Sequence, residues 1–298
     1  MNILISGGTG FIGSALCNLL VSSGHSVTVL SRKPDKVSTF CGAQVKAIKT
    51  LESLPVNSQI DVIINLAGAP IADARWTLKR KKLLLSSRIN TTRQIIDFIS
   101  RLTTKPKVLI SSSAVGYYGD RGDTILDEES GFHDDFAHNL CAQWEHAASE
   151  ASDHGVRVCL LRIGLVIGEE GGFLKRMILP FKFGLGGRLG DGQQWMSWIH
   201  RQDLINMIEM LINTDHLKGV FNGTAPNPVT NSNFTKTLAN CLNRFAIIPA
   251  PAFVLKLALG EMSVLLLGGQ RVIPKRFLDE GFSFQYETLE SALKDVVK

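Results

Sequence analysis

The chain opens with the sequence Met1-Asn2-Ile3-Leu4-Ile5-Ser6-Gly7-Gly8-Thr9-Gly10-Phe11-Ile12-Gly13-Ser14. The apolar run Ile3–Ile5 predicts a short strand, and a helical apolar pattern follows the glycines. A strand that leads through a glycine turn into a helix is the opening of a dinucleotide-binding βαβ unit. In such a unit Gly7 permits the tight turn, Gly10 lets the backbone approach a pyrophosphate, and Gly13 lets the helix pack against the strand. The predicted cofactor-binding residues of this turn are Gly7, Thr9, Gly10, Phe11, Ile12 and Gly13.

The composition is that of a globular protein with a mild positive charge. Of the 298 residues, 45% are hydrophobic and 20% are charged, which suffices for a core and argues against disorder. The formal net charge of +5 suits an anionic ligand. The only dense basic run, Lys79–Lys82, is typical of a solvated helix face, so we predict no nucleic-acid partner.

Cysteine usage and apolar run lengths bear on the cellular compartment. The five cysteines are scattered and odd in number, which is typical of free thiols in a reducing compartment and gives no metal-binding framework. The first strand begins so early that we expect no signal peptide. The longest apolar tract, Phe253–Leu267, contains Lys256 and Glu261 and is too short to span a bilayer. We therefore expect a cytoplasmic protein with no membrane partner and no metal.

Strand and helix patterns alternate through the first half of the chain. The predicted strands cover residues 3–5, 26–30, 44–48, 61–67, 107–111 and 156–162. Long amphipathic helices are predicted at 78–102 and 136–152. This alternation predicts the α/β class, a Rossmann-type doubly wound parallel sheet with a smaller, mostly helical C-terminal region for substrate binding or capping.

The pattern loosens after Gly168. We predict that residues 1–168 form the dinucleotide-binding domain and that 193–228 return to it, whereas 169–192 and 229–298 form the substrate or cap region. Helices are predicted there at 202–213, 232–243, 252–267 and 289–297. A glycine-dense loop, 184–192, suits either a mobile lid over a substrate or a flexible connector.

The residues after the second strand bear on the choice of cofactor. An NAD-binding protein usually has Asp or Glu there to hold the ribose 2′-hydroxyl. This chain has Ser31-Arg32-Lys33, a hydroxyl and two cations that would bind a 2′-phosphate. The sequence therefore favours NADP, although Arg32 and Lys33 could also be ordinary surface charges.

In these features the chain resembles the extended short-chain dehydrogenase/reductases, the group of the nucleoside-diphosphate-sugar epimerases. The motifs that carry the resemblance are Gly7–Gly13, Asn65–Gly68, Ser111–Ala114, Tyr117–Gly119, Trp198–Leu204 and Gly219–Asn222. It is most similar to an atypical branch called epimerase family proteins. That closer similarity rests on Arg75-Trp76, Ser87-Arg88, Phe183–Gly187 and the tail Gly268–Arg276.

The resemblance implies roles for further residues. Leu66, Ala67 and Gly68 would pass the adenosine and ribose of the cofactor, and Arg88 would approach its phosphates. Ser111 would also contact the cofactor. Ser113 falls on the family's catalytic serine, which hydrogen-bonds the substrate hydroxyl or carbonyl. The substrate would be a small molecule, with nucleotide sugars among the candidates.

One expected feature of that family is missing. Its members use a Tyr-x-x-x-Lys pair, in which the lysine acidifies the tyrosine that moves the proton. No lysine occurs between Lys107 and Lys175, and no Tyr-x-x-x-Lys exists anywhere in the chain. By register with Glu145, the tyrosine and lysine places fall near Ala137 and Cys141. The candidate substitutes for the proton transfer are Tyr117, Tyr118 and His138.

Two hypotheses follow from the sequence. The first is an NADP(H)-dependent oxidoreductase or epimerase-like enzyme with a rebuilt acid–base group, in which Ser113 orients the substrate oxygen. The second is a non-enzymatic NADP(H)-binding sensor that reports to a protein partner, for which the basic tail with Arg271, Lys275 and Arg276 is a candidate contact. We expect that tail to be a packing cap on the sheet.

Overall fold

The computed structural model describes residues 1–169 and 171–297. At its centre, within this described part, is a seven-stranded parallel sheet in the order β11-β7-β5-β4-β1-β2-β3. Its strands in chain order are β1 Asn2–Ser6, β2 Ser26–Leu30, β3 Lys46–Ile48, β4 Val62–Asn65, β5 Val108–Ala114, β7 Arg157–Ile163 and β11 Gly219–Gly223. The strand order reverses at β1, between β2 and β4, which defines a doubly wound sheet with a crevice at the carboxyl ends of β1 and β4. The predicted fold class is confirmed.

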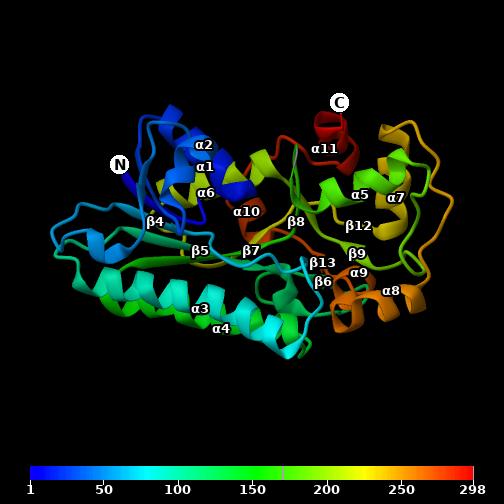
Figure 1. Ribbon diagram of the computed structural model, residues 1–298, viewed down its shortest axis with the longest axis horizontal. Helices are drawn as coiled ribbons and strands as arrows, with labels where there is room; N and C mark the ends of the chain where they lie inside the picture. Colours follow the sequence, from blue (N-terminus) through cyan, green and yellow to red (C-terminus); the bar gives the residue numbers. More distant parts are fainter. Residues whose placement is uncertain (170, 298) are drawn as a thin grey trace.

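Helices cover both faces of this sheet (Figure 1). One face carries α3 Leu78–Arg101 and α4 Phe136–Ser149, and the other carries α1 Phe11–Ser22, α2 Val37–Cys41 and α6 Arg201–Asn213. Successive side chains of a strand point to opposite faces of the sheet, so each central strand contributes to the cores on both faces. Ile63 of β4 packs in the core of the α3 side with Ile95, whereas Ile64 packs in the other core with Leu16. Both isoleucines are fully buried, as a parallel strand between two helical layers requires.

The rest of the chain adds short strands and a helical region. Three two-stranded pairs join β8 Leu165–Ile167 to β10 Trp198–His200, β9 Trp195–Met196 to β12 Val229–Thr230, and β6 Ile125–Leu126 to β13 Arg271–Val272. The helices are α5 Gly172–Lys182, α7 Asn231–Cys241, α8 Ala252–Leu259, α9 Val264–Leu267, α10 Lys275–Asp279 and α11 Leu289–Val296. The domain boundaries stay a prediction. No helix in the described part of the chain is both long enough and apolar enough to cross a membrane.

Besides short elements that were not predicted, such as α2, α10 and the three strand pairs, three differences from the sequence-based prediction concern the site and the C-terminal region. The single helix expected at 252–267 is wrong, because Gly260 has a φ of +61° and starts a 3₁₀ turn between α8 and α9. Helix α5 was not predicted, since it starts at Gly172 directly after Gly171 and contains Pro180. Strand β5 extends to Ala114, so Ser112 and Ser113 lie within the sheet rather than after it, as Ser111 does.

Candidate cofactor and active site

The glycine turn after β1 is built by close backbone contacts. Gly7 has a φ of +76°, and its carbonyl accepts a hydrogen bond from the Gly10 amide at 3.0 Å. A Cβ atom on Gly13 would lie 2.4 Å from that carbonyl oxygen, and one on Gly7 would lie 2.7 Å from the Leu66 carbonyl carbon. Side chains at these positions are therefore excluded, and the ends of β1, α1 and β4 meet tightly.

The turn leaves the amino end of α1 open to a ligand. The N-cap residue Gly10 has no side chain to bond the first amides of the helix, and the first turn carries no acidic residue. Such an end presents unpaired N–H groups and a positive dipole, which fit a pyrophosphate. The structure thus offers the donors that a bound dinucleotide needs at the predicted place.

Most of the other predicted cofactor residues gather around this turn. Leu66–Gly68 continue from β4, and a Cβ atom on Gly68 would lie 3.0 Å from Cζ of Arg88. Burial lowers the pKa of Arg88, whose guanidinium donates to the Leu84 carbonyl at 3.1 Å and lies over the Trp144 ring. Arg88 is thus held beside the cofactor strand. Thr9 and Ile12 are half-buried in the turn and the first helical residues.

Phe11 has a packing role in addition to its predicted position at the cofactor. Its ring lies against Gly171 and Gly172, where a Cβ atom would overlap it, and beneath the guanidinium of Arg201 at 4.8 Å. The side chain therefore joins the first helix to the start of α5. A cofactor would meet the backbone of Phe11 rather than its ring.

Ser31, Arg32 and Lys33 follow β2 at the same edge of the sheet. The Ser31 hydroxyl accepts a hydrogen bond from the Lys33 amide at 3.1 Å. Arg32 and Lys33 are exposed, and neither forms an ion pair with a residue in the described part of the chain. Both cations are therefore available to an anion at this edge.

The first two serines of β5 belong to a buried polar network. Asn65 donates to the hydroxyls of Thr92 and Ser111, at 2.8 and 3.2 Å, and accepts from Ser6. Ser112 donates to the Asn65 carbonyl at 2.9 Å. Ser111 is fully buried in this network, so its contact with a cofactor stays a prediction.

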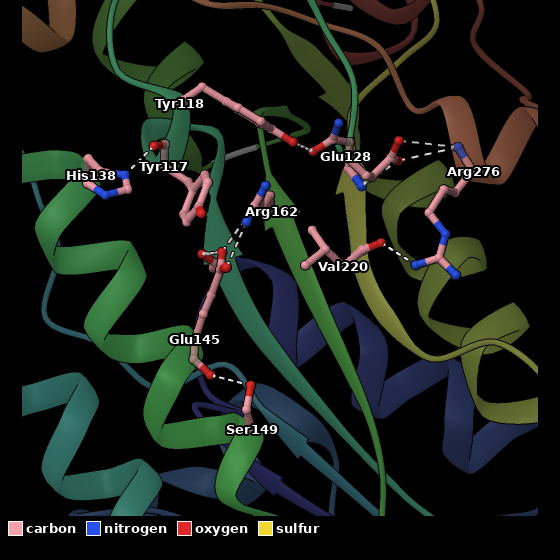
Figure 2. A network of polar contacts seen from close by, with 11 residues as sticks. Tyr117, Tyr118, Glu128, His138, Glu145, Ser149, Arg162, Val220 and Arg276 are labelled. Atoms are coloured by element: carbon pink, nitrogen blue, oxygen red, sulfur yellow. Dashed lines mark hydrogen bonds and ion pairs between the residues drawn. The ribbon is translucent and has the colours of Figure 1, made fainter. Parts of the chain in front are cut away.

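Ser113 belongs to a second network that sequence reasoning missed (Figure 2). Its hydroxyl donates to Oε1 of Glu145 at 2.6 Å, and Arg162 of β7 binds both oxygens of the same carboxylate at 2.8 Å. All three side chains are buried. Burial alone would lower the pKa of Arg162, but the hydrogen bonds and charge of Glu145 outweigh it and raise that pKa. Nη1 of Arg162 is buried without a hydrogen-bond partner among the described residues.

A signal for this pair was present in the sequence. Arg162 ends the apolar run Val158–Leu161, and a charge in a strand buried on both faces requires a partner. Glu145 stands on the preceding α-helix, α4, and from the sequence alone it indicates only the register of the expected tyrosine and lysine positions.

Tyr117 and Tyr118 have different surroundings, although they are adjacent in sequence. Tyr118 is fully buried and donates to Oδ1 of Asn222 at 2.8 Å, and burial raises the pKa of Tyr118 to about 12. Tyr117 is half-buried, with its ring 3.3 Å from Cζ of Arg162. In Figure 2 the Tyr117 hydroxyl is on the side of its ring that faces the Glu145 carboxylate.

His138 is fixed by Tyr117. Helix α4 begins after Asp135, whose carboxylate accepts from the His138 amide at 2.7 Å. Nδ1 of the His138 ring lies 2.6 Å from the Tyr117 carbonyl oxygen, which can only accept, so the proton is assigned to Nδ1. The ring also stacks on Phe132 at 3.7 Å.

The places of the absent dyad are filled by small buried residues. Ala137 and Cys141 are both buried on the face of α4 that packs on the sheet. Burial, with the nearby charge of Glu145, raises the pKa of the Cys141 thiol to about 11. Neither position supplies a cation or a proton donor near neutral pH.

His200 and Asp203 have structural contacts. The His200 ring caps α6 by accepting from the Gln202 amide at 3.2 Å, and the Asp203 carboxylate accepts from the amides of Gln285 and Tyr286. The tail is tied down elsewhere too, because Glu128 accepts from the amides of Asn222 and Arg276 (Figure 2). These contacts agree with a packing role for the tail.

We expect stability to fall on acidification because of His200. Burial lowers the pKa of His200 to about 4, below its usual 6.5, and a protonated ring can no longer accept from the Gln202 amide. The unfolded chain thus binds more protons between these two values, so stability is complete above pH 6.5 and is lost as the pH falls toward 4. The loss should be roughly 1–3 kcal/mol. Urea unfolding at pH 7 and pH 4.5 measures it.

His200→Asn should remove this part of the pH dependence, because asparagine caps a helix without titrating. The exposed His146, changed to Asn, is the matched control and should leave the dependence intact. An unchanged slope in His200→Asn would contradict the assignment.

Comparison with known proteins places these features in a family. The model of the NAD dependent epimerase/dehydratase family matches residues 3–222, and a domain of unknown function, DUF1731, matches residues 250–296. The epimerase family protein YfhF of Bacillus subtilis (strain 168) is 42% identical over 302 residues, which cover 100% of this chain and 98% of the relative. The chloroplastic SDR39U1 homolog of Arabidopsis thaliana is 39% identical, over 100% of this chain and 87% of the relative.

A solved structure agrees along the whole chain. The crystal structure of the human epimerase family protein SDR39U1 (isoform 2) with NADPH has a TM-score of 0.90 at 37% identity, covering 100% of this chain and 99% of the human one. The resemblance seen in the sequence motifs is confirmed. This chain belongs to the NAD dependent epimerase/dehydratase family.

Proposed function

We propose that this protein binds NADP(H) and catalyses an oxidoreductase or epimerase-like reaction on a small molecule that carries a hydroxyl or carbonyl group. The main observation in support of this proposal is a single network at the carboxyl ends of β5 and β7, which is formed by Ser113, Glu145, Arg162 and Tyr117. The glycine turn lies at the same edge, after β1. Ligands of doubly wound folds bind along this edge.

The residues present fit NADP(H). The open end of α1 suits its pyrophosphate, and Ser31, Arg32 and Lys33 suit its 2′-phosphate. The human relative, which is 37% identical, was crystallised with NADPH. When bound, the nicotinamide supplies the hydride or accepts it.

Ser113 orients the substrate in this proposal. Its proton is directed to Glu145 at 2.6 Å, which leaves the oxygen lone pairs as acceptors. A substrate hydroxyl would donate to them, whereas a substrate carbonyl, which only accepts, would take its hydrogen bond from the Tyr117 hydroxyl. Arg162 keeps the carboxylate in place by binding both of its oxygens, so the serine is held in one orientation.

Tyr117 is the group we propose to transfer the proton. Its ring packs on the Arg162 guanidinium at 3.3 Å, and in Figure 2 its hydroxyl is on the side of the ring that faces the Glu145 carboxylate. The contact with the guanidinium holds the ring in place against the group that carries Ser113 and Glu145. His138 then has a positioning role, because it binds the Tyr117 carbonyl. Tyr118 has no role in this proposal, since its hydroxyl is buried on Asn222.

The proposal is tested with a library of carbonyl compounds, nucleotide sugars included: NADPH absorbance reports net reduction, and chromatography of the products reports epimerisation, which returns the hydride and leaves the absorbance unchanged. We expect turnover with at least one compound and a loss of about 10²–10⁴ in kcat for Tyr117→Phe. His138→Gln should cost less and should change kcat more than the affinity for NADPH.

Tyr286→Phe is the matched control, because this tyrosine is half-buried in the tail, next to the His200 ring. Its kcat should equal that of the unmodified protein. Full activity in Tyr117→Phe, with His138→Gln inactive, would instead make His138 the proton carrier.

A second candidate function is an NADP(H) sensor without catalysis. The observation that favours it is the small, non-ionised pair Ala137 and Cys141 at the places of the dyad. NADPH binding without turnover of any library compound, together with NADPH-dependent recovery of one protein partner, would favour this candidate. Recovery of every partner regardless of NADPH would contradict it.

We also propose a reducing compartment such as the cytoplasm. The five cysteines are free thiols, and this includes Cys17 and Cys41, which are buried next to each other and share a side-chain hydrogen bond without forming a disulfide.

A further inference from the structure

Helix α8 is an apolar helix that the fold leaves uncovered. Every residue of Ala252–Leu259 except Lys256 is apolar, yet none of them is buried. Phe253 is 72% exposed and Leu257 is 79% exposed, one helical turn apart on the same face. A helix that is apolar on nearly all sides is normally buried in a globular protein, so the exposed face of α8 indicates a binding partner outside the chain.

Two neighbouring loops extend the apolar face. Phe183 and Leu185 follow α5, and Phe245 and Ile247 follow α7; all four are strongly exposed. Backbone hydrogen bonds join these loops, from Ile248 to the Gly186 carbonyl and from Ala250 to the Arg188 carbonyl. Figure 1 shows the chain between α7 and α8 running along the outer edge of this end of the molecule. We call the exposed side chains of α8 and the two loops the apolar end surface; its members are Phe183, Leu185, Phe245, Ile247, Phe253 and Leu257.

The area is too large to be incidental. Phe183, Phe245 and Phe253 are 73%, 83% and 72% exposed. At about 200 Å² for each side chain, they alone expose on the order of 450 Å² of apolar surface. This already equals the largest patch on a typical monomer, and such patches mark interaction sites.

Cations predominate around the apolar end surface, and the flanking acidic residues are Asp191 and Glu261, of which Glu261 is paired with Lys81. Neither residues 171–190 nor residues 216–260 contain an aspartate or glutamate. Arg188, Lys236 and Arg244 line one pocket of about 430 Å³ together with Phe245 and Ile247. Lys182 stands beside Phe183, and Lys256 lies on α8 between Phe253 and Leu257. Exposed aromatic and aliphatic side chains are thus interleaved with cations.

We propose that the apolar end surface docks on an anionic lipid membrane surface. Apolar side chains that project from loops and a short helix enter the boundary between headgroups and acyl chains, and flanking Lys and Arg side chains bind anionic headgroups. This proposal departs from the expectation of no membrane partner, which rested on the absence of an apolar tract long enough to span a bilayer.

The excess of positive charge at the apolar end surface disfavours a second copy of the chain as its binding partner. A symmetric dimer across this surface would bring its cations against the same cations of the partner, and the flanking Asp191 and Glu261 are too few to pair them all. A membrane that contains anionic lipids supplies both the apolar layer and the opposite charge.

The test is sedimentation of the full chain with lipid vesicles. Vesicles of phosphatidylcholine with about a third of phosphatidylglycerol should bind the protein, and pure phosphatidylcholine vesicles should bind it much less. Phe253→Ser with Leu257→Ser should weaken binding to the anionic vesicles at least about tenfold. Arg244→Glu with Lys256→Glu should weaken it roughly tenfold or more and reduce its dependence on salt, which Lys182, Arg188 and Lys236 would still maintain in part.

Phe40→Ser with Leu78→Ser is the matched control, because these side chains are 51% and 81% exposed on α2 and α3. It should bind vesicles as the unmodified chain does, and circular dichroism melting should show every variant folded. The proposal is overturned by equal binding to both vesicle types, by no binding to either, or by unchanged binding of the Phe253→Ser and Leu257→Ser variant. If light scattering shows a dimer of the unmodified chain, and the Phe253→Ser and Leu257→Ser variant is a monomer, then the apolar end surface binds a second copy of the chain and not a membrane.

Discussion

Glu145→Ala is expected to lower the free energy of unfolding by about 3–5 kcal/mol, the largest loss of stability among the substitutions considered. The carboxylate is the bidentate partner of Arg162, and both side chains are buried. Its removal leaves a guanidinium without a partner, and arginine cannot shed its proton to escape the cost. Urea unfolding at neutral pH, followed by circular dichroism, measures the change.

The double variant Glu145→Leu with Arg162→Met tests the cause. If the loss comes from the unpaired charge rather than from packing, removing both charges should recover much of the stability. Glu290→Ala is the matched control, because Glu290 pairs with Lys294 on the surface of α11 and should change nothing measurable. A Glu145→Ala protein as stable as this control would mean that the pair is not buried in solution.

The layered sheet could be predicted from the sequence because its signals are local. The run around Val62–Asn65 is apolar without interruption, and the turn at Gly7–Gly13 admits little besides a dinucleotide-binding unit. The C-terminal region was predicted less well. Gly260 carries no sign in its neighbours that it would take a positive φ and divide a long apolar tract into α8 and α9.

The candidate site was predicted in part, for a related reason. Ser113 could be found because the resemblance fixes its place on β5, but its link to Glu145 spans 32 positions and depends on how α4 crosses the sheet. Likewise, nothing in the sequence of Tyr117 and Tyr118 tells which ring is buried, because the 3₁₀ turn Val115–Tyr118 decides it. Such long-range contacts have no local periodicity to reveal them.

Arg32→Ala with Lys33→Ala is expected to weaken NADPH binding by about 100-fold or more and to change NADH binding by less than about threefold. A charged hydrogen bond contributes about 1.5–3 kcal/mol, or roughly 10- to 100-fold in affinity for each cation. Only NADPH carries the 2′-phosphate that these cations would bind, and both are exposed and unpaired with any described acidic residue. Fluorescence titration with each cofactor measures both affinities.

Lys107→Ala with Lys218→Ala is the matched control, since both lysines are exposed and just precede β5 and β11, at the amino edge of the sheet. It removes the same net charge far from the carboxyl edge, so it separates a local contact from the general attraction of a basic protein for an anion. Equal losses in the two double variants would mean that long-range charge, not a 2′-phosphate site, sets the affinity. Equal losses for NADPH and NADH in Arg32→Ala with Lys33→Ala would show that the two cations bind a part that both cofactors share, such as the pyrophosphate, and the preference for NADP would then have to come from other residues.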